Sequence, residues 1–347
     1  MTSVNVAVVG MGKMGLLHSC IFNGLDEGNV VAVCENDKLM SNILNKYLRN
    51  IKVYRDFNKM LETEEIDGLV ITTPVFLHKP MIESGFNEDI NLFVEKPLAL
   101  DGSECRSIMN TVKTSKKCIS MVGYCRRFMD TFRLADEIIK SETLGKPIYF
   151  YSQLFVSQVF KPGKGWMYDP KSSGGGVLTD LGSHAFDMFS FLFGDVYSAH
   201  GFSKAEYNLQ VEDYAIINLK FKNDLIGSLQ ISWSIRNYRL PELKIKVVLE
   251  KGDIIVTEKY IDIWSESENE MLKKGSNVFY KQDLTKNVPI NIGGPEYTLE
   301  DRHFLQCIKE GTSTSCSFEE AAKANFVIDA IYSSIKSGEA EKVRYEV

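Results

Sequence analysis

A glycine-rich hexapeptide, GMGKMG, directly follows a short apolar run near the start of the chain and constrains the fold more than any other feature. The apolar run covers residues 4–9, and a helical pattern begins at Lys13. With a strand before it and a helix after it, this spacing predicts a dinucleotide-binding loop. Gly10 permits a tight turn, Gly12 lets the backbone approach a pyrophosphate, and Gly15 lets the helix pack closely on the strand. The predicted cofactor-binding residues of the loop are Gly10, Met11, Gly12, Lys13, Met14 and Gly15.

An acidic residue stands where such a loop requires one for the ribose. Glu35 lies 20 residues after Gly15, at the end of the second predicted strand, where a carboxylate can accept both ribose hydroxyls. The same charge repels a 2′-phosphate, so we expect NAD as the cofactor. NADP stays an open alternative because Lys38 is near in the sequence.

Short β-branched runs alternate with amphipathic segments as far as Gly123, and this alternation predicts a doubly wound parallel sheet. Helical spacing of apolar residues marks 38–49 and 102–113. We therefore expect an NAD(P)-binding Rossmann domain over residues 1–123. Its expected strands are 4–9, 30–34, 52–54, 68–72, 92–95 and 118–123.

After Gly123 the alternation of short strands with helices gives way to longer predicted strands. This change predicts a second domain, residues 124–347, of α/β class. Hairpin-like turns at 222–224 and 250–253 predict antiparallel pairing in an open sheet. Residues 265–294 are polar and irregular and are interpreted as excursions or a lid. The expected helices are 131–141, 299–310 and 318–336, and the expected strands are 148–156, 214–221, 225–234, 243–249 and 254–257.

Composition restricts the class of protein. A net charge of -6 argues against nucleic acid and anionic membranes as partners, and no apolar stretch approaches the roughly 20 residues of a membrane span. The start of the chain lacks the basic region of a secretory signal. Seven scattered cysteines without a Cys-x-x-Cys pair favour a reducing cytoplasm, without disulfides or structural zinc. We expect a cytoplasmic protein whose partners are small molecules.

Two predicted strands end in polar residues that should face one crevice. Thr73 and Pro74 follow the fourth strand, and Glu95, Lys96 and Pro97 close the fifth. Ligands of open α/β sheets bind beyond the carboxyl ends of the strands, so Lys96 is a candidate for chemistry. The alternative is a solvated surface lysine. We note the Lys96–Pro97 peptide as a candidate cis bond.

A third cluster lies in the segment 172–187, where three glycines lead into a helical pattern. Asp180 and His184 are four residues apart, a spacing that places both side chains on one face of a helix, and Asp187 continues that face. Three interpretations are open: an ion pair on a solvated face, two ligands of a metal, or catalysis. The apolar residues around the pair disfavour the first. The other histidines show no ligand spacing with His184, so no metal is predicted.

These motifs, in this order, resemble the glucose-fructose oxidoreductase and inositol dehydrogenase (Gfo/Idh/MocA) family over essentially the whole chain. The matching pieces are GMGKMG, Thr73-Pro74 with His78, Glu95-Lys96-Pro97, GYCRRF from Gly123, and GGGVLTDLGSH from Gly174. The resemblance implies a Rossmann domain joined to a domain with an open, mainly antiparallel sheet that builds homodimers or homotetramers. It also implies Lys96, Asp180 and His184 as the catalytic set.

The resemblance further implies which residues contact ligands. Cofactor contacts would come from Thr73, Pro74, His78, Glu95 and Lys96, and substrate contacts from Lys96, Arg126, Trp166, Asp180 and His184. Val75 departs from the family, since many members have asparagine there, and Cys125 replaces a more usual neighbour of Arg126. The loops around Trp166, Tyr168 and Tyr238 match no subfamily, so the substrate stays open.

Together the residues predict NAD-dependent oxidation of a secondary hydroxyl in a sugar, a cyclitol or a nucleotide-linked sugar. His184 is the expected base because its ordinary pKa lies near working pH, Asp180 would orient substrate and histidine, and Lys96 would stabilise the alkoxide. The alternatives are a cofactor-binding sensor without turnover and a reductase working in the opposite direction. A nucleotide-linked substrate needs an anion site, for which Arg126, Arg127, Arg133, Lys161 and Lys164 are candidates by charge.

Overall fold

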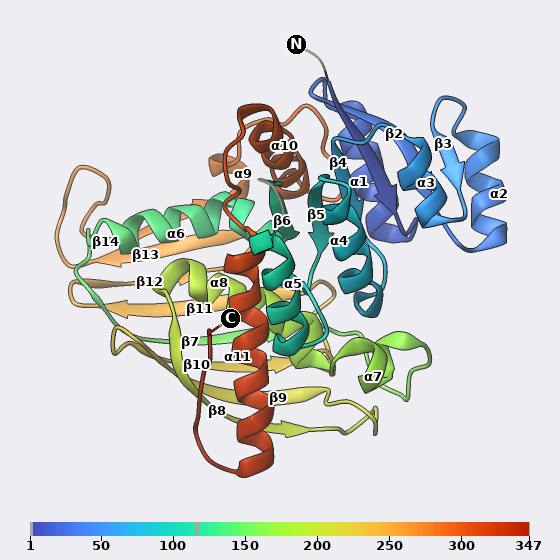
Figure 1. Cartoon of the computed structure of the whole chain (residues 1–347). Helices are drawn as coiled ribbons and strands as arrows, with labels where there is room; N and C mark the ends of the chain where they lie inside the picture. Colours follow the sequence, from blue (N-terminus) through green and yellow to red (C-terminus); the bar gives the residue numbers. More distant parts are fainter. Residues whose placement is uncertain (1–2, 115–117, 347) are drawn as a thin grey trace. The chain divides into compact units, whose positions relative to one another are not determined.

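The computed structural model describes residues 3–114 and 118–346, and its contacts divide the chain into two compact units (Figure 1). The first unit holds the residues up to Cys125 and also the segment Asn287–Ala322. The second unit holds Arg126–Lys286 and Lys323–Glu346. By its contacts the segment 287–322 groups with the first unit, because helix α10 (Pro295–Glu310) packs on α1 (Lys13–Gly24) and β1 (Val4–Val9).

The described strands of the first unit form a parallel sheet in the order β3-β2-β1-β4-β5-β6. The order reverses between β1 and β4, which is where doubly wound sheets bind their ligands. The sheet confirms the predicted fold class and lies among helices, as Figure 1 shows. The remaining elements are β2 (Gly28–Cys34), β3 (Lys52–Tyr54), β4 (Gly68–Ile71), β5 (Asn91–Glu95), β6 (Ser120–Gly123), α2 (Lys38–Tyr47), α3 (Phe57–Thr63), α4 (His78–Asn87) and α5 (Gly102–Thr114).

Burial explains why these runs form strands. All four residues of β4 are buried, and β1 is buried except at one half-exposed position, as expected when helices cover both faces of a parallel sheet. Phe304 of α10 contributes to this core, with its ring centroid 5.7 Å from that of Phe93 and 6.4 Å from that of Phe22. The apolar face of α10 therefore has its partners in the first unit.

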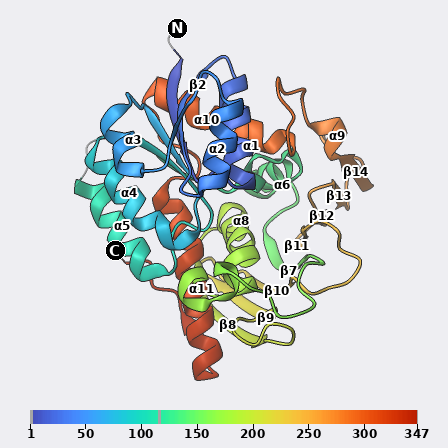
Figure 2. The same ribbon diagram turned by 90° about the vertical axis from the view of Figure 1, so that its right-hand side faces the viewer.

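The second unit is built on a mixed sheet whose described strands run in the order β14-β13-β12-β11-β7-β10-β9-β8-β15. Phe150 of β7 stacks on Phe193 of α8 at 4.5 Å, and Ile331 of α11 lies over Gly201 of β8. Figures 1 and 2 show α8 and α11 along the same face. The elements are β7 (Pro147–Phe155), β8 (Val196–Lys204), β9 (Tyr214–Phe221), β10 (Ile226–Ser232), β11 (Glu242–Leu249), β12 (Gly252–Val256), β13 (Tyr260–Ser265), β14 (Gly275–Tyr280), β15 (Glu341–Lys342), α6 (Asp130–Lys140), α7 (Pro170–Ser173), α8 (Ser183–Phe193), α9 (Lys281–Leu284) and α11 (Phe318–Ser337).

The sheet confirms the predicted mainly antiparallel pairing, with two local departures from the expectations for this unit. Strand β7 pairs with β10 in parallel, although hairpins make β9–β10 and β11–β12 antiparallel as predicted. A local turn fixes only strands adjacent in sequence, and β7 meets β10 across some 76 residues. The segment 265–294 is not wholly irregular either, since it contains β14, which pairs with β13, and the short helix α9.

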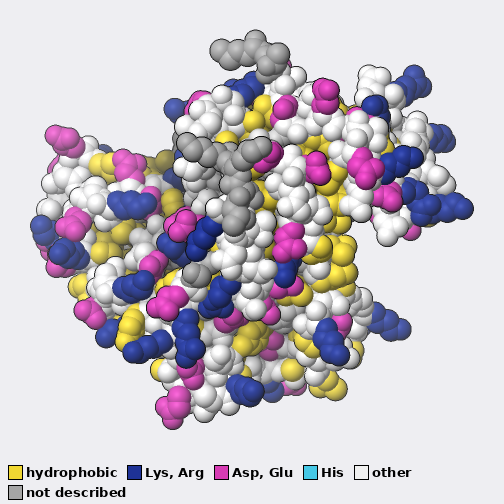
Figure 3. All heavy atoms as spheres, viewed as in Figure 1, with side chains coloured by type: hydrophobic (Ala, Val, Ile, Leu, Met, Phe, Trp, Pro, Cys, Tyr) yellow, Lys and Arg dark blue, Asp and Glu magenta, His cyan; other side chains and the backbone are white. Residues whose placement is uncertain are grey.

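The surface carries both signs of charge. Lys and Arg side chains are interspersed with Asp and Glu side chains over the face drawn in Figure 3. Within the part of the chain that the structure describes, no helix is both long enough and apolar enough to cross a bilayer.

Candidate active site

The glycine loop after β1 has the geometry that its sequence predicts. Gly10 has a φ of +88°, in the left-handed region that favours glycine, and a Cβ there would lie 2.9 Å from Thr73 Cγ2. A Cβ on Gly15 would lie 2.1 Å from the carbonyl oxygen of Gly10, so α1 can approach the loop only with glycine at this position. Both positions therefore require glycine for the turn and for close packing.

Gly12 differs from these two glycines because its side-chain direction is open. No atom lies within 4 Å of the place where its Cβ would be. Gly12 is also the N-cap of α1, where no side chain accepts a cap hydrogen bond and the first turn contains no acid. An anion approaching Gly12 would meet open space and helix N-terminal amides, so these residues fit the pyrophosphate of a dinucleotide.

Glu35 holds the loop against the second strand. One of its carboxylate oxygens accepts from the backbone N of Met11 and the other from the backbone N of Asp37, each at 2.8 Å. Each oxygen keeps a second lone pair that can accept a ribose hydroxyl. Glu35, the predicted ribose-binding residue, thus also stabilises the glycine loop, a role that the motif alone did not indicate.

The loops after β4 and β5 are tied together by His78. Its Nε2 lies 2.9 Å from the carbonyl oxygen of Thr73, and its Nδ1 lies 3.0 Å from that of Pro97. His78 is buried with 1% exposure, and burial lowers the pKa of its ring although both carbonyls act in the opposite direction. The side chain therefore positions these loops, and our expectation that it contacts the cofactor has no support from its burial.

Lys96 and its neighbours lie at the end of β5 in the first unit. Lys96 is half-buried, as are Thr73 and Pro74, and the Lys96–Pro97 peptide is cis. Glu95 is 8% exposed and accepts the backbone N–H of Lys96 through Oε2 at 3.0 Å. Val75 is buried with 3% exposure and packs in the core of this unit.

Asp180 and His184 lie on consecutive turns of the second unit and are both half-buried. Asp180 belongs to a π-helical turn, Leu178–Gly182, that leads without a break into α8, where His184 is the second residue. The sequence predicted a continuous α-helix through both residues and gave no sign of this turn. Single π-turns within helices occur frequently at functional sites.

Glu212 fixes this turn, and sequence reasoning missed it. Its carboxylate accepts the backbone N–H groups of Gly176 and Leu178 at 2.9–3.1 Å and the hydroxyl of Tyr332 at 2.9 Å. A Cβ on Gly176 would lie 2.1 Å from the carbonyl oxygen of Glu212, which explains a glycine here. Burial raises the pKa of the Glu212 carboxyl, while Leu178 and the other donors act in the opposite direction. Because Glu212 lies 32 residues beyond Asp180, no local pattern could reveal the contact.

Asp187 and two of the arginines are engaged in structural ion pairs. Arg127 donates to both carboxylate oxygens of Asp187 at 2.7–3.1 Å, and both residues are at most 5% exposed. Arg126 donates through Nε to Glu258 at 3.0 Å. Asp187 therefore belongs to the packing of α8, and the predicted substrate contact of Arg126 would have to use its remaining donors. Trp166 is 41% exposed on a short turn, and Arg133, Lys161 and Lys164 are exposed.

Two family models match the chain on either side of residue 130. Residues 4–124 match the oxidoreductase family with an NAD-binding Rossmann fold, and residues 136–344 match the C-terminal α/β domain of the same family. The chain belongs to the Gfo/Idh/MocA oxidoreductase family. This Gfo/Idh/MocA protein is accordingly an NAD-dependent oxidoreductase, which confirms the resemblance and the cofactor inferred from the sequence.

Relatives of this Gfo/Idh/MocA protein include enzymes that act on cyclitols and sugars. It is 26% identical to scyllo-inositol 2-dehydrogenase (NAD(+)) of Bacillus subtilis over 89% of this chain and 87% of that protein. It is 21% identical to D-apiose dehydrogenase of Paraburkholderia graminis over 97% and 89%. Its fold matches levoglucosan dehydrogenase solved in complex with NADH, with a TM-score of 0.90, 20% identity and coverage of 99% and 100%.

Proposed function

We propose that this protein oxidises a secondary hydroxyl of a free sugar or cyclitol, with NAD as the hydride acceptor and with Lys96, Asp180 and His184 as the catalytic residues. The observation that carries the proposal is the acid-histidine pair itself, presented by a turn that Glu212 and Tyr332 fix from outside the motif. The cyclitol and sugar dehydrogenases among the relatives support the same substrate class.

The chemistry requires a base, an acceptor that orients the substrate and a cation near the oxygen. When bound, NAD supplies the acceptor for the hydride that leaves the carbon. His184 removes the hydroxyl proton, because an imidazole is an efficient base near neutral pH. Asp180 accepts a neighbouring substrate hydroxyl and orients the imidazole. Lys96 stabilises the developing alkoxide through its ammonium charge. Glu35, Thr73 and Pro74 complete the proposed cofactor contacts.

Two arginines of the second unit, Arg126 and Arg127, favour a free sugar or cyclitol over a nucleotide-linked sugar. A diphosphate needs charged donors, and Arg127 gives both Nε and Nη2 to Asp187. Arg126 gives its Nε to Glu258. Because each guanidinium already faces a carboxylate, neither offers the uncompensated charge that a diphosphate site uses.

A substrate screen tests the proposed function directly. Purified protein is incubated with NAD, and in parallel with NADP, against inositols, free aldoses, glucuronates and nucleotide sugars, and reduced cofactor is followed by absorbance. We expect turnover with NAD on at least one free polyol and weaker turnover with NADP, because the Glu35 carboxylate repels a 2′-phosphate. Absence of turnover across the panel, with NAD binding retained, would favour the sensor interpretation instead.

We further propose that the protein forms a homodimer or homotetramer through the exposed face of its mixed sheet around β7 and β10. Side chains alternate along β7, so Tyr149 and Tyr151 point away from buried Phe150 and are 42% and 52% exposed. The pairing register sets Ile226, 56% exposed, beside Tyr149. A group of exposed aromatic and aliphatic side chains on one sheet face is typical of a self-complementary interface.

Charges placed on this face should dissociate the oligomer. We expect Tyr151→Glu combined with Ile226→Glu to sediment as a monomer at micromolar concentration, because the substitution brings like charges together across a two-fold interface. Leu39→Glu is the matched control, since Leu39 is 70% exposed on α2 of the first unit. Sedimentation of the unmodified protein as a monomer would contradict the proposal.

A further inference from the structure

A chain of buried charged residues ends at the backbone of Lys96. Its members are His18 of α1, Asp301 of α10 and Glu95 of β5, and all three belong to the first unit. His18 and Asp301 are 0% exposed and Glu95 is 8% exposed. Charged groups are seldom buried this deeply unless they are paired, so the contacts among them need an explanation.

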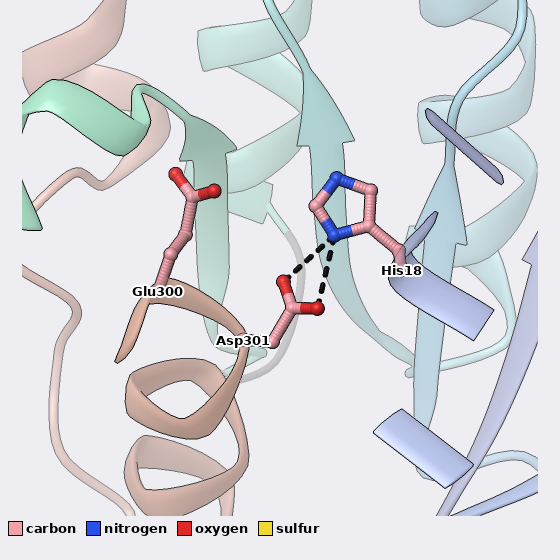
Figure 4. Close-up of side chains that lie close together, drawn as sticks. All are labelled: His18, Glu300 and Asp301. Carbon is pink, nitrogen blue, oxygen red and sulfur yellow. Dashed lines mark hydrogen bonds and ion pairs between the residues drawn. The ribbon is translucent and has the colours of Figure 1, made fainter. Parts of the chain in front are cut away.

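Both nitrogens of the His18 ring face carboxylates. Its Nδ1 lies 2.8 Å and 3.0 Å from the two carboxylate oxygens of Asp301, and its Nε2 lies 3.2 Å from Oε1 of Glu95. Figure 4 shows the two bonds between His18 and Asp301. Burial acts against a charge on the ring, but Asp301 and Glu95 outweigh it and hold the pKa of His18 well above its usual range. Burial likewise raises the pKa of the Asp301 carboxyl, to about 6, so the geometry carries the argument: each ring nitrogen faces a carboxylate oxygen, and both contacts are hydrogen bonds when the ring carries both protons.

Glu95 connects the His18 ring to the backbone of the next residue, Lys96. Its Oε1 faces His18, while its Oε2 accepts the backbone N–H of Lys96 at 3.0 Å. We propose that Asp301, His18 and Glu95 form a positioning relay that fixes the backbone of Lys96 and thereby aims the lysine at the substrate oxygen. The relay rests on the proposed function, because it matters to turnover only if Lys96 acts on the substrate.

The surroundings of the ring make the relay rigid. The His18 ring centroid lies 5.0 Å from that of Phe93 and 6.3 Å from those of Phe22 and Tyr297. Aromatic walls of this kind exclude water and lower the local dielectric, which strengthens hydrogen bonds between charged groups. The ring therefore cannot exchange Asp301 or Glu95 for solvent without a large cost.

A metal site is the competing interpretation of these residues. One ligand atom each from His18, Glu300 and Asp301 lies within 4.8 Å of the others, close enough for a shared ion. An imidazole binds a metal through a deprotonated nitrogen, whereas both nitrogens of His18 are already directed at carboxylates. The contacts therefore favour the relay.

Asp301→Asn tests the relay without touching Lys96. The amide keeps the shape of the side chain but removes the charge that holds the second proton on His18, so the contact with Glu95 should weaken. We expect kcat to fall about tenfold to a hundredfold, as small misplacements of catalytic groups do. NAD affinity, measured by protein fluorescence, should stay within about threefold, since the glycine loop is unaltered.

A second measurement does not need turnover. We expect the labelling rate of Lys96 by trinitrobenzenesulfonate, followed by peptide mapping, to change in Asp301→Asn and in His18→Gln. The double variant should show little further loss of kcat, because both substitutions act through one chain of contacts. Thr298→Val is the matched control: Thr298 lies on the same helix, is 1% exposed, and bonds to the Ile290 carbonyl outside the relay.

The outcomes separate the two proposals. Folded Asp301→Asn and His18→Gln variants that keep both the kcat and the Lys96 labelling rate of the unmodified protein would overturn the relay. So would one equivalent of a divalent metal that is bound by the purified protein and lost in His18→Gln. If Lys96→Ala instead turns over normally, the catalytic role of Lys96 fails, while altered labelling in Asp301→Asn would still establish the contact.

Discussion

Replacement of Lys96 or of His184 by alanine is expected to lower turnover by roughly a hundredfold or more while leaving NAD affinity nearly unchanged. His184→Ala removes the base that takes the hydroxyl proton, and Lys96→Ala removes the cation beside the developing alkoxide. Neither side chain belongs to the glycine loop that would hold the pyrophosphate. The measurement is steady-state kcat on the substrate found in the screen, together with NAD titration by fluorescence.

Lys59→Ala is a suitable control for this pair, because Lys59 is an exposed lysine of α3 in the same unit as Lys96. It should leave both kcat and NAD affinity unaltered. Full activity in both Lys96→Ala and His184→Ala would refute the catalytic assignment. Loss of NAD binding in His184→Ala would point to a structural role rather than a chemical one, whereas in Lys96→Ala it would point to the cofactor contact that the family resemblance implies.

The second large effect concerns stability. Asp187→Asn is expected to destabilise the second unit by about 3–5 kcal/mol, because it leaves the Arg127 guanidinium buried opposite a neutral group. The pair qualifies as buried, since the side chains of Arg127 and Asp187 are 4% and 1% exposed. For a unit of this size the loss corresponds to a fall in melting temperature of roughly 10 °C.

A surface pair provides the comparison. Lys204 pairs with Glu206 where both side chains are more than half exposed, so Lys204→Ala should leave the melting temperature nearly unchanged. Arg127→Met combined with Asp187→Leu should recover most of the stability lost in Asp187→Asn, since no unpaired charge is then buried. If Asp187→Asn has the same melting temperature as the unmodified protein, the Arg127–Asp187 ion pair does not stabilise the second unit.

Much of the first unit could be read from the sequence because its signals are local. Apolar runs of strand length, glycines at fixed offsets and an acid at the end of β2 each occupy a few consecutive residues. The predicted strands and the observed β1 to β6 agree to within about two residues at their ends. In the second unit, β13 alternates clearly, with Ile261 and Ile263 buried, and was overlooked, whereas β14 is short and largely exposed and gave little signal.

The candidate site divides in the same way. The motif spacing correctly placed glycines where the backbone approaches closely, whereas the catalytic roles of Lys96, Asp180 and His184 stay predictions. It assigned His78 to the cofactor, although that side chain is buried between two loops, and it extended one helical face to Asp187, which pairs with Arg127. Both contacts join residues that lie apart in the chain, where the type of a residue does not indicate its partner.

The sequence by itself determined the parallel nucleotide-binding sheet, the glycine loop, the preference for NAD and the family. These depend on periodicity and spacing over short stretches, and local steric rules translate them directly into structure. The tertiary structure alone decided that α10 joins the first unit, that β7 runs parallel to β10, and that Asp301 reaches His18 across 283 residues. Such contacts depend on which surfaces are buried together once the chain is compact. A local sequence pattern does not indicate which distant segments will pack against one another.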